Sequence, residues 1–179
     1  MIVILDIETQ QLIPEDRNLK SLRISIAGAR HNGIDRMFDE SQVKELFALL
    51  DNAELIVGHN LLNFDYRVLQ NYADFDVKQR YKDKTLDFQH VIVKKTDRLV
   101  SLNDLAKRNL GQEKLGVGKD APALFSDGKF DELKSYLAYD LRLTNDLFEH
   151  VRKHGKLKYG HIVYQEPEER EVLITISDR

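Results

Sequence analysis

The stretch Ile2-Val3-Ile4-Leu5-Asp6-Ile7-Glu8-Thr9 at the start of the chain decides the fold. It is an apolar run typical of a buried β-strand, and it carries two carboxylates two residues apart. Side chains alternate between the two faces of a strand. Ile2, Ile4, Asp6 and Glu8 are therefore expected on one face, with Val3, Leu5 and Ile7 on the other.

Two like charges at the end of an apolar strand need something that neutralises them, because a buried, unpaired carboxylate must take up a proton or destabilise the fold. A divalent metal ion beside Asp6 and Glu8 is one solution. Alternatively, the two acids end the strand and face water, or pair with Lys and Arg. An Asp-x-Glu triplet is common, so it does not decide between these readings by itself.

Composition narrows the class of protein. The 179 residues suit one domain with its own core, and 42% hydrophobic and 32% charged residues are ordinary for a soluble fold. The net charge of -3 argues against a general polyanion-binding surface, although a local basic strip remains compatible with it. The absence of cysteine excludes disulfides, thiolate metal ligands and a cysteine nucleophile.

The sequence also lacks the features of a membrane-spanning segment or a secretory signal peptide. No apolar run is long enough to span a bilayer, and the N-terminus lacks the basic region and cleavage site of a signal peptide. We expect no membrane association and a cytoplasmic location.

The sequence after the first strand predicts a mixed sheet. Ser21 to Ala29 alternates as a half-exposed strand, Asn32-Gly33 is a strong hairpin signal, and Ile34 to Phe38 returns as a third strand. These strands form an antiparallel meander. Further strands are predicted at Leu55–Val57, which leads through a polar turn into a helix from Phe64 to Tyr72, and at Thr85–Val93.

Helix signals occupy most of the remaining chain. Asp39 and Gln42 have the spacing of a capping box before a helix that ends near Asp51. Ser101 and Gly111 have the residue types of an N-cap and a C-cap. A loop is expected around Gly116, Gly118 and Pro122, followed by a long helix from about Phe130 to His154.

The C-terminal tail predicts two short strands, His161–Gln165 and Glu171–Ile176, around an acidic turn at 166–169. An isolated hairpin is marginal in water, so we expect it either to dock on the domain's own surface or to pair through its edge with a second copy or a partner. The expected domains are residues 1–155 and a hairpin appendage at 156–179.

Four acids stand at the edges of predicted core elements: Asp6, Glu8, Asp65 at a helix start, and Asp140 inside the last long helix. In this order they resemble the motifs of the DEDD superfamily of 3′→5′ exonucleases, over roughly residues 1 to 154. The motifs here are Leu-Asp6-Ile-Glu8-Thr, His-Asn60-Leu-Leu-Asn-Phe64-Asp65 and Tyr136-Leu-Ala-Tyr-Asp140. The resemblance implies an α/β ribonuclease H-like fold, in which helices flank a mixed five-stranded sheet, here followed by a C-terminal β-hairpin.

The third motif resembles the Tyr branch of that superfamily. Tyr136 stands four residues before Asp140, whereas Ser135 occupies the position where the other branch carries a histidine. The resemblance therefore implies Tyr136 as a catalytic residue that orients water and the scissile phosphate, with core packing as the alternative. Tyr139 lies one residue off the predicted face and is a natural control.

The resemblance also implies a cofactor and a substrate. Asp6, Glu8, Asp65 and Asp140 would hold two Mg²⁺ or Mn²⁺ ions, because carboxylate oxygens favour hard cations. The expected activity releases nucleoside 5′-monophosphates from single-stranded DNA or RNA 3′ ends. Residues expected to contact the substrate are Ile7, Thr9, Asn60 and Phe64.

Other polar residues are weaker candidates. Lys94, Lys95, Arg98, Lys114 and Lys119 have the residue type for phosphate contacts, although a charge run is more often a solvated loop. Four histidines, His59, His90, His150 and His154, are interpreted as surface or core residues rather than metal ligands.

Two alternatives remain at this stage. One is a ribonuclease H-type endonuclease, which takes its second acid from a helix rather than from position i+2 of the first strand. The other is a nucleic-acid-binding or assembly domain without turnover. Neither preference for DNA nor preference for RNA follows from these residues.

Overall fold

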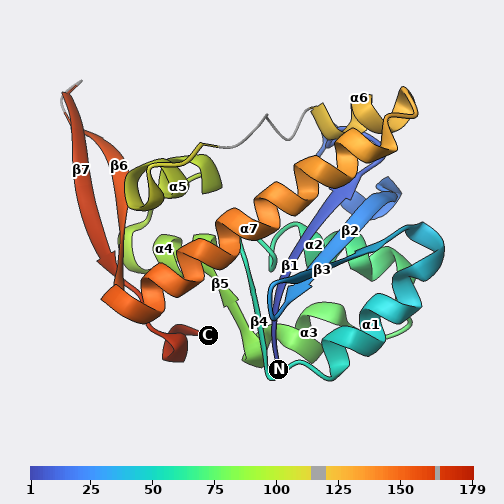
Figure 1. Ribbon diagram of the computed structural model, residues 1–179, viewed down its shortest axis with the longest axis horizontal. Coiled ribbons are helices and arrows are strands. Elements are labelled where there is room, and N and C mark those ends of the chain that lie inside the picture. Colours follow the sequence, from blue (N-terminus) through green and yellow to red (C-terminus); the bar gives the residue numbers. More distant parts are fainter. Residues whose placement is uncertain (114–119, 164–165) are drawn as a thin grey trace.

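The computed structural model describes residues 1–113, 120–163 and 166–179, and for residues 161–163 and 166–167 it describes the backbone. Its centre is one five-stranded sheet with the order β3-β2-β1-β4-β5 (Figure 1). The strands are β1 (Ile2–Thr9), β2 (Ile24–His31), β3 (Ile34–Phe38), β4 (Leu55–Gly58) and β5 (Thr85–Asp87). β1, β2 and β3 pair antiparallel, whereas β4 pairs parallel with both β1 and β5. This confirms the predicted mixed sheet.

The turn between β2 and β3 follows the sequence signal. Asn32 and Gly33 have φ values of +49° and +77°, the left-handed conformation that a two-residue hairpin turn requires at both positions. β2 itself begins at Ile24, later than predicted, because residues Leu19–Ser21 form a 3₁₀ turn before it.

Seven α-helices are found among the described residues: α1 (Val43–Asp51), α2 (Asp65–Leu69), α3 (Val77–Tyr81), α4 (Phe88–Thr96), α5 (Leu102–Leu110), α6 (Asp120–Ser126) and α7 (Phe130–His154). The predicted capping box of Asp39 and Gln42 is present, on the short 3₁₀ turn that leads into α1. The Ser101 cap and the left-handed Gly111 are also confirmed at the ends of α5.

The helices cover the two faces of the sheet and bury two apolar clusters. Val3, Leu5 and Ile7 of β1 pack with α1, α2 and α3, whereas Ile4 packs with α4, α5 and α7. In Figure 1 the long helix α7 runs diagonally across the sheet. The predicted alternation along β1 is therefore confirmed, and the face of Asp6 and Glu8 is the one that α7 covers.

Two predictions are wrong: the strand Thr85–Val93 and the placement of Pro122 in a loop. The predicted strand Thr85–Val93 stops at Asp87, where the Asp87 side chain caps α4 by accepting a hydrogen bond from His90 N–H at 3.2 Å. The apolar residues Phe88, Val91 and Ile92 have helical spacing and form the buried side of α4.

Pro122 lies in the first turn of α6 rather than in a loop, and a helix tolerates proline there because the first N–H groups have no partner within the helix. The rest of the predicted loop, including Gly116 and Gly118, lies outside the described residues.

The tail forms the predicted hairpin with different bounds, β6 (Lys156–Val163) and β7 (Glu166–Leu173). β6 begins directly after Gly155, whose φ of +69° ends α7, so the first strand starts five residues before the predicted His161. The predicted acidic turn at 166–169 is instead part of β7, and Ile174 to Ile176 follow the strand. Gln165 lies outside the described residues.

The hairpin docks on the surface of the domain, one of its two predicted placements. Leu157, Tyr159 and Val172 are buried in the same cluster as α7. The Asn109 amide of α5 donates to the Lys158 carbonyl and accepts from the Lys158 N–H, both at 2.8 Å. The Asp104 carboxylate accepts from the Gly160 N–H at 2.8 Å. Side chains of α5 therefore occupy the free edge of β6.

In the part of the chain that the structure describes, none of the helices is both long enough and apolar enough to cross a membrane.

Candidate metal centre

The acidic residues of β1 meet an aspartate of α7. One carboxylate oxygen from each of Asp6, Glu8 and Asp140 lies within 4.8 Å of the other two. Asp140 is 1% exposed, whereas Asp6 and Glu8 are half-buried. Three carboxylates at this separation repel one another unless protons or cations neutralise them.

A glycine of β2 allows α7 to approach the sheet beside this cluster. Gly28 is the register partner of Asp6. A Cβ atom at Gly28 would lie 2.7 Å from Leu141 Cδ1 and 3.0 Å from Leu137, which is closer than side chains pack. Because Leu137 and Leu141 flank Asp140 on α7, this close contact holds Asp140 near β1.

Asp65, at the start of α2, is the fourth acid. It is 1% exposed, and its Oδ1 has no hydrogen-bond partner among the described residues. Burial raises the pKa of the Asp65 carboxyl well above its ordinary value, and the nearby charges of Asp6, Asp87 and Glu8 raise it further. The Asp65 carboxyl is therefore stabilised by binding either a proton or a cation.

The residues present fit a hard divalent cation. Carboxylate oxygens are the ligands that Mg²⁺ and Mn²⁺ prefer, and the buried oxygen of Asp65 is available for such an ion. Asp6, Glu8, Asp65 and Asp140 are the residues that would hold it.

A cavity of about 740 Å³ opens beside the acids. Three of the acids line it, Asp6, Glu8 and Asp65, and so do all four residues predicted to contact a substrate, namely Ile7, Thr9, Asn60 and Phe64. The cavity therefore brings together residues from β1, the β4–α2 loop and the start of α2. Leu12 and Ile13 add apolar surface, and they are 57% and 53% exposed.

Several cavity residues were not found by sequence reasoning: Gln11, Leu12, Ile13, His59, Gln89, Leu102, Pro122 and Thr144. His59 was interpreted as an ordinary surface or core residue, and it lines this cavity with its Nε2 2.8 Å from the Val100 carbonyl oxygen. The sequence could have indicated Thr144 as a site residue, because it lies one helical turn after Asp140 on the same face of the helix.

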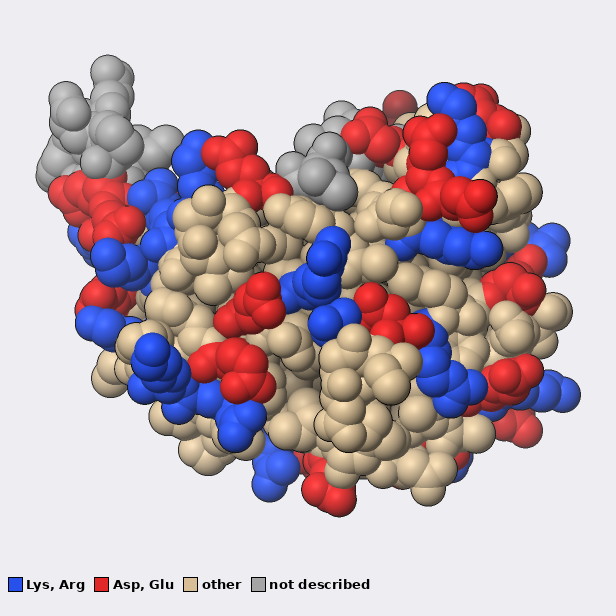
Figure 2. Space-filling model, viewed as in Figure 1, with Lys and Arg blue, Asp and Glu red and all other residues tan. Residues whose placement is uncertain are grey.

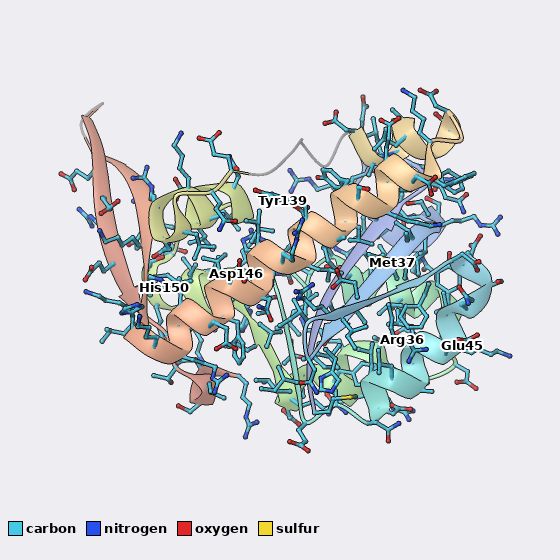
Figure 3. All side chains as sticks on the ribbon, in the orientation of Figure 1. Arg36, Met37, Glu45, Tyr139, Asp146 and His150 are labelled. Atoms are coloured by element: carbon cyan, nitrogen blue, oxygen red, sulfur yellow. The ribbon has the colours of Figure 1, made fainter. Side chains whose placement is uncertain are left out.

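The side chains of Tyr136 and Tyr139 lie on different sides of α7, as the helical spacing predicts. Tyr136 is 6% exposed and lies one turn before Asp140 in the buried side of α7. Tyr139 donates its hydroxyl to the Glu113 carbonyl at 2.9 Å, and it lies along α7 in the same row as Asp146 and His150 (Figure 3). Neither Tyr136 nor Asp140 is among the described residues that line the cavity, and both are buried.

The basic candidates are partly engaged elsewhere. Lys94 and Lys95 belong to the last turn of α4 rather than to a loop. Lys95 donates to the Leu173 carbonyl at 2.8 Å and pairs with Asp178 at 2.7 Å, so its ammonium holds the C-terminal segment. Lys114 and Lys119 lie outside the described residues. Positive and negative side chains are interspersed over the face shown in Figure 2.

The sequence matches the profile of the RNase H superfamily over residues 3–156, a range that includes all four acids and the five-stranded sheet except Ile2. The chain belongs to the RNase H superfamily. No curated protein matches the sequence.

Solved structures share the fold of this RNase H-superfamily chain. A family B DNA polymerase from the hyperthermophilic archaeon Pyrobaculum calidifontis has a TM-score of 0.63 at 16% identity, covering 84% of this chain and 24% of the polymerase. The chain therefore spans about a quarter of that enzyme. The EXO domain of Nibbler from Aedes aegypti has a TM-score of 0.61 at 13% identity, covering 85% of this chain and 78% of the domain.

Proposed function

We propose that this protein is a metal-dependent 3′→5′ exonuclease of the DEDD superfamily, Tyr branch. The observation that carries the proposal is the meeting of Asp6, Glu8 and Asp140 within 4.8 Å of one another. The buried Asp65 stands beside the same cavity. Membership of the RNase H superfamily and the fold shared with the Nibbler EXO domain support it.

The proposed roles use the four acids as metal ligands. Asp6, Glu8 and Asp140 would hold one Mg²⁺ or Mn²⁺ ion, and Asp65 with Asp6 would hold a second. Bound divalent ions supply an activated water and neutralise the charge that develops on the phosphate and on the leaving oxygen. Tyr136 would orient the water and the phosphate through its phenolic hydroxyl.

The cavity suits the end of a single strand. Phe64, Leu12 and Ile13 offer apolar surface to the terminal nucleotide, and Asn60 offers an amide; Thr9 and the buried Ile7 also line the cavity. We propose single-stranded DNA or RNA 3′ ends as substrates and nucleoside 5′-monophosphates as products. Residues 1–155 carry the activity, and the hairpin at 156–179 is an appended element. A second copy or a partner would pair along β7, because α5 covers the edge of β6. A cytoplasmic location stays a prediction.

The test uses DNA and RNA oligonucleotides labelled at either end, with Mg²⁺, with Mn²⁺ or with chelator. We expect mononucleotides to be released from the 3′ end and chelator to abolish the release. Asp6→Ala and Asp140→Ala should remove turnover, whereas Asp74→Ala, at an exposed loop position, should retain it.

Two outcomes would replace the proposal. Internal cleavage of a circular substrate would indicate a ribonuclease H-type endonuclease. Oligonucleotide binding without cleavage under all metal conditions would indicate a binding or assembly domain.

A further inference from the structure

Asp87, at the end of β5, lies outside the four-acid site and is 1% exposed. Its Oδ1 accepts hydrogen bonds from the backbone N–H groups of Asn60 at 2.8 Å and His90 at 3.2 Å. Its Oδ2 accepts from the N–H of Leu62 at 3.0 Å. One carboxylate thus caps α4 and also holds two backbone amides of the loop between β4 and α2.

The loop that Asp87 holds has an unusual backbone. Asn60 has a φ of +70°, a left-handed conformation that disfavours residues other than glycine. Gly58, the register partner of Asp87, is packed so tightly that a Cβ there would lie 2.5 Å from Leu61 Cγ. A strained, close-packed turn of this kind persists only when its surroundings hold it.

The turn at Asn60 determines where the cavity residues point. The Asn60 carbonyl accepts hydrogen bonds from Asn63 N–H at 3.3 Å and Phe64 N–H at 3.0 Å, and α2 starts at the next residue, Asp65. Asn60, Phe64 and Asp65 all line the cavity. A shift of the Asn60 backbone would therefore move a proposed substrate amide, an aromatic ring and a metal ligand together.

We infer that Asp87 is a positioning residue, which holds the β4–α2 loop so that Asn60 and Phe64 present the substrate-binding surface. This inference rests on the proposed function. Asp87 acts through the loop and touches neither the substrate nor the reacting atoms. Hydrogen bonds from N–H groups to an ionised carboxylate are stronger than neutral ones, which suits a carboxylate in this role.

The test compares Asp87→Asn with Thr85→Val, a matched variant on the same strand. Thr85 also links β5 to α2, through its Oγ1 2.6 Å from the Tyr66 hydroxyl, but it does not contact the loop amides. Amide hydrogen exchange at Asn60 and Leu62 reports the loop without any need for turnover. Oligonucleotide binding in chelator reports the substrate surface, and KM and kcat report the reaction.

We expect D87N to lower exchange protection in the Asn60–Leu62 loop, because its amide keeps one acceptor oxygen and turns an NH₂ donor toward a backbone N–H. It should also weaken oligonucleotide binding and raise KM about tenfold, the size of effect expected from a lost charge-assisted hydrogen bond. T85V should keep the protection, the binding and KM. Adding Asn60→Ala to D87N should weaken binding less than Asn60→Ala does alone, because both act on one surface.

A lower kcat with unchanged KM, unchanged binding and additive behaviour with Asn60→Ala would show that Asp87 only stabilises the fold and would overturn the inference. If D87N does not fold, Asp87→Ser replaces two acceptor oxygens by one and should change the same readouts. Binding by a wild-type protein that never cleaves would reject the proposed exonuclease while leaving the positioning role testable by binding. A wild-type protein that neither binds nor cleaves would reject both.

Discussion

At the scale of single residues, the candidate site is a set of acids whose charges are costly in the folded protein without a cation. Asp65 is the clearest case, because it is almost fully buried and its Oδ1 has no hydrogen-bond partner among the described residues. Its raised pKa means that ionisation of Asp65 favours unfolding.

We therefore expect Asp65→Asn to stabilise the metal-free protein by about 1–3 kcal/mol at pH 8, because it removes the buried charge. Since the folded-state pKa is raised, the gain should be smallest in acid, near the ordinary carboxyl pKa, and should grow as pH rises. Urea unfolding in chelator measures this gain. Mg²⁺ should then raise the melting temperature of the wild type more than that of the variant. A variant that is less stable at every pH would contradict this account of the site.

Tyr136 and Tyr139 give a second residue-scale prediction. Tyr136→Phe should lower kcat about 10- to 100-fold by removing one oriented hydroxyl beside Asp140. Tyr139→Phe should change kcat little, because its hydroxyl contacts the Glu113 carbonyl instead. Single-turnover cleavage of a labelled oligonucleotide measures both rates, and equal effects of the two changes would reject the Tyr-branch assignment.

At the scale of elements, the site depends on how closely α7 approaches the sheet. Gly28 sets that approach, because Leu137 and Leu141 occupy the space that a side chain would fill. The local sequence signals of β2 and α7 are independent of this contact.

Gly28→Ala should destabilise the protein by about 1–3 kcal/mol through overpacking. It should also weaken Mg²⁺ binding, because the displaced helix carries Asp140 away from Asp6. Ala29→Val is the control, since Ala29 is buried in the cluster on the opposite face of the sheet. It should reduce stability but leave Mg²⁺ binding by the folded protein unchanged in calorimetric titration. Equal losses of Mg²⁺ affinity in both variants would show that this contact does not set the position of Asp140.

Hydrogen bonds between the Asn109 side chain of α5 and the backbone of β6 hold the C-terminal hairpin on the domain. Asn109→Ala should lower the free energy of unfolding by about 1–3 kcal/mol, because it removes both hydrogen bonds to the backbone of Lys158. Asn52→Ala is the control, as the exposed Asn52 amide, at the C-cap of α1, donates to the Ala48 carbonyl four residues before it. Deleting residues 161–179 should lower the melting temperature further. If the deletion changes neither the melting temperature nor the mass in solution, the hairpin is neither a packed element nor an interface.

At the scale of the whole molecule, one carboxylate links distant parts of the chain around the sheet. Glu40 accepts hydrogen bonds from Arg23 Nε at 2.7 Å and Nη2 at 2.8 Å, from the Tyr72 hydroxyl at 2.6 Å and from Gln10 Nε2 at 3.2 Å. The hydrogen bond from Arg23 is the main cause that lowers the pKa of Glu40. Burial and the contact with Glu40 raise the pKa of Tyr72 to about 12.

Because its pKa is lowered on folding, Glu40 contributes stability above its ordinary pKa of 4.5, and this contribution is lost as pH falls through the folded-state pKa. Glu40→Gln should therefore cost about 1 kcal/mol at pH 7, a modest value because the pair is partly exposed. The cost should shrink at pH 3.5 (roughly one unit below the ordinary carboxyl pKa). Glu149→Gln, in an exposed pair with Arg152, should have little effect at either pH. A cost for Glu40→Gln that does not change with pH would contradict a role for its charge.

The sequence by itself determined the features that depend on a few neighbouring residues. The alternation along β1 placed Asp6 and Glu8 on one face, Asn32-Gly33 specified the β2–β3 turn, and Phe130–His154 was predicted with the bounds that the structure has. These signals act locally, because strand alternation, turn conformation and helical spacing are properties of the backbone over one or two turns.

Only the tertiary structure decided which distant residues meet. Asp140 reaches Asp6 because α7 crosses the sheet over Gly28, and Asp87 holds the Asn60 loop because β4 and β5 pair in parallel. The residues after Asp87 look equally apolar as strand or helix in short windows, and the cap at Asp87 with burial on one side made them α4. Such contacts join residues far apart in the chain, and their geometry depends on the packing of whole elements, which no local pattern contains.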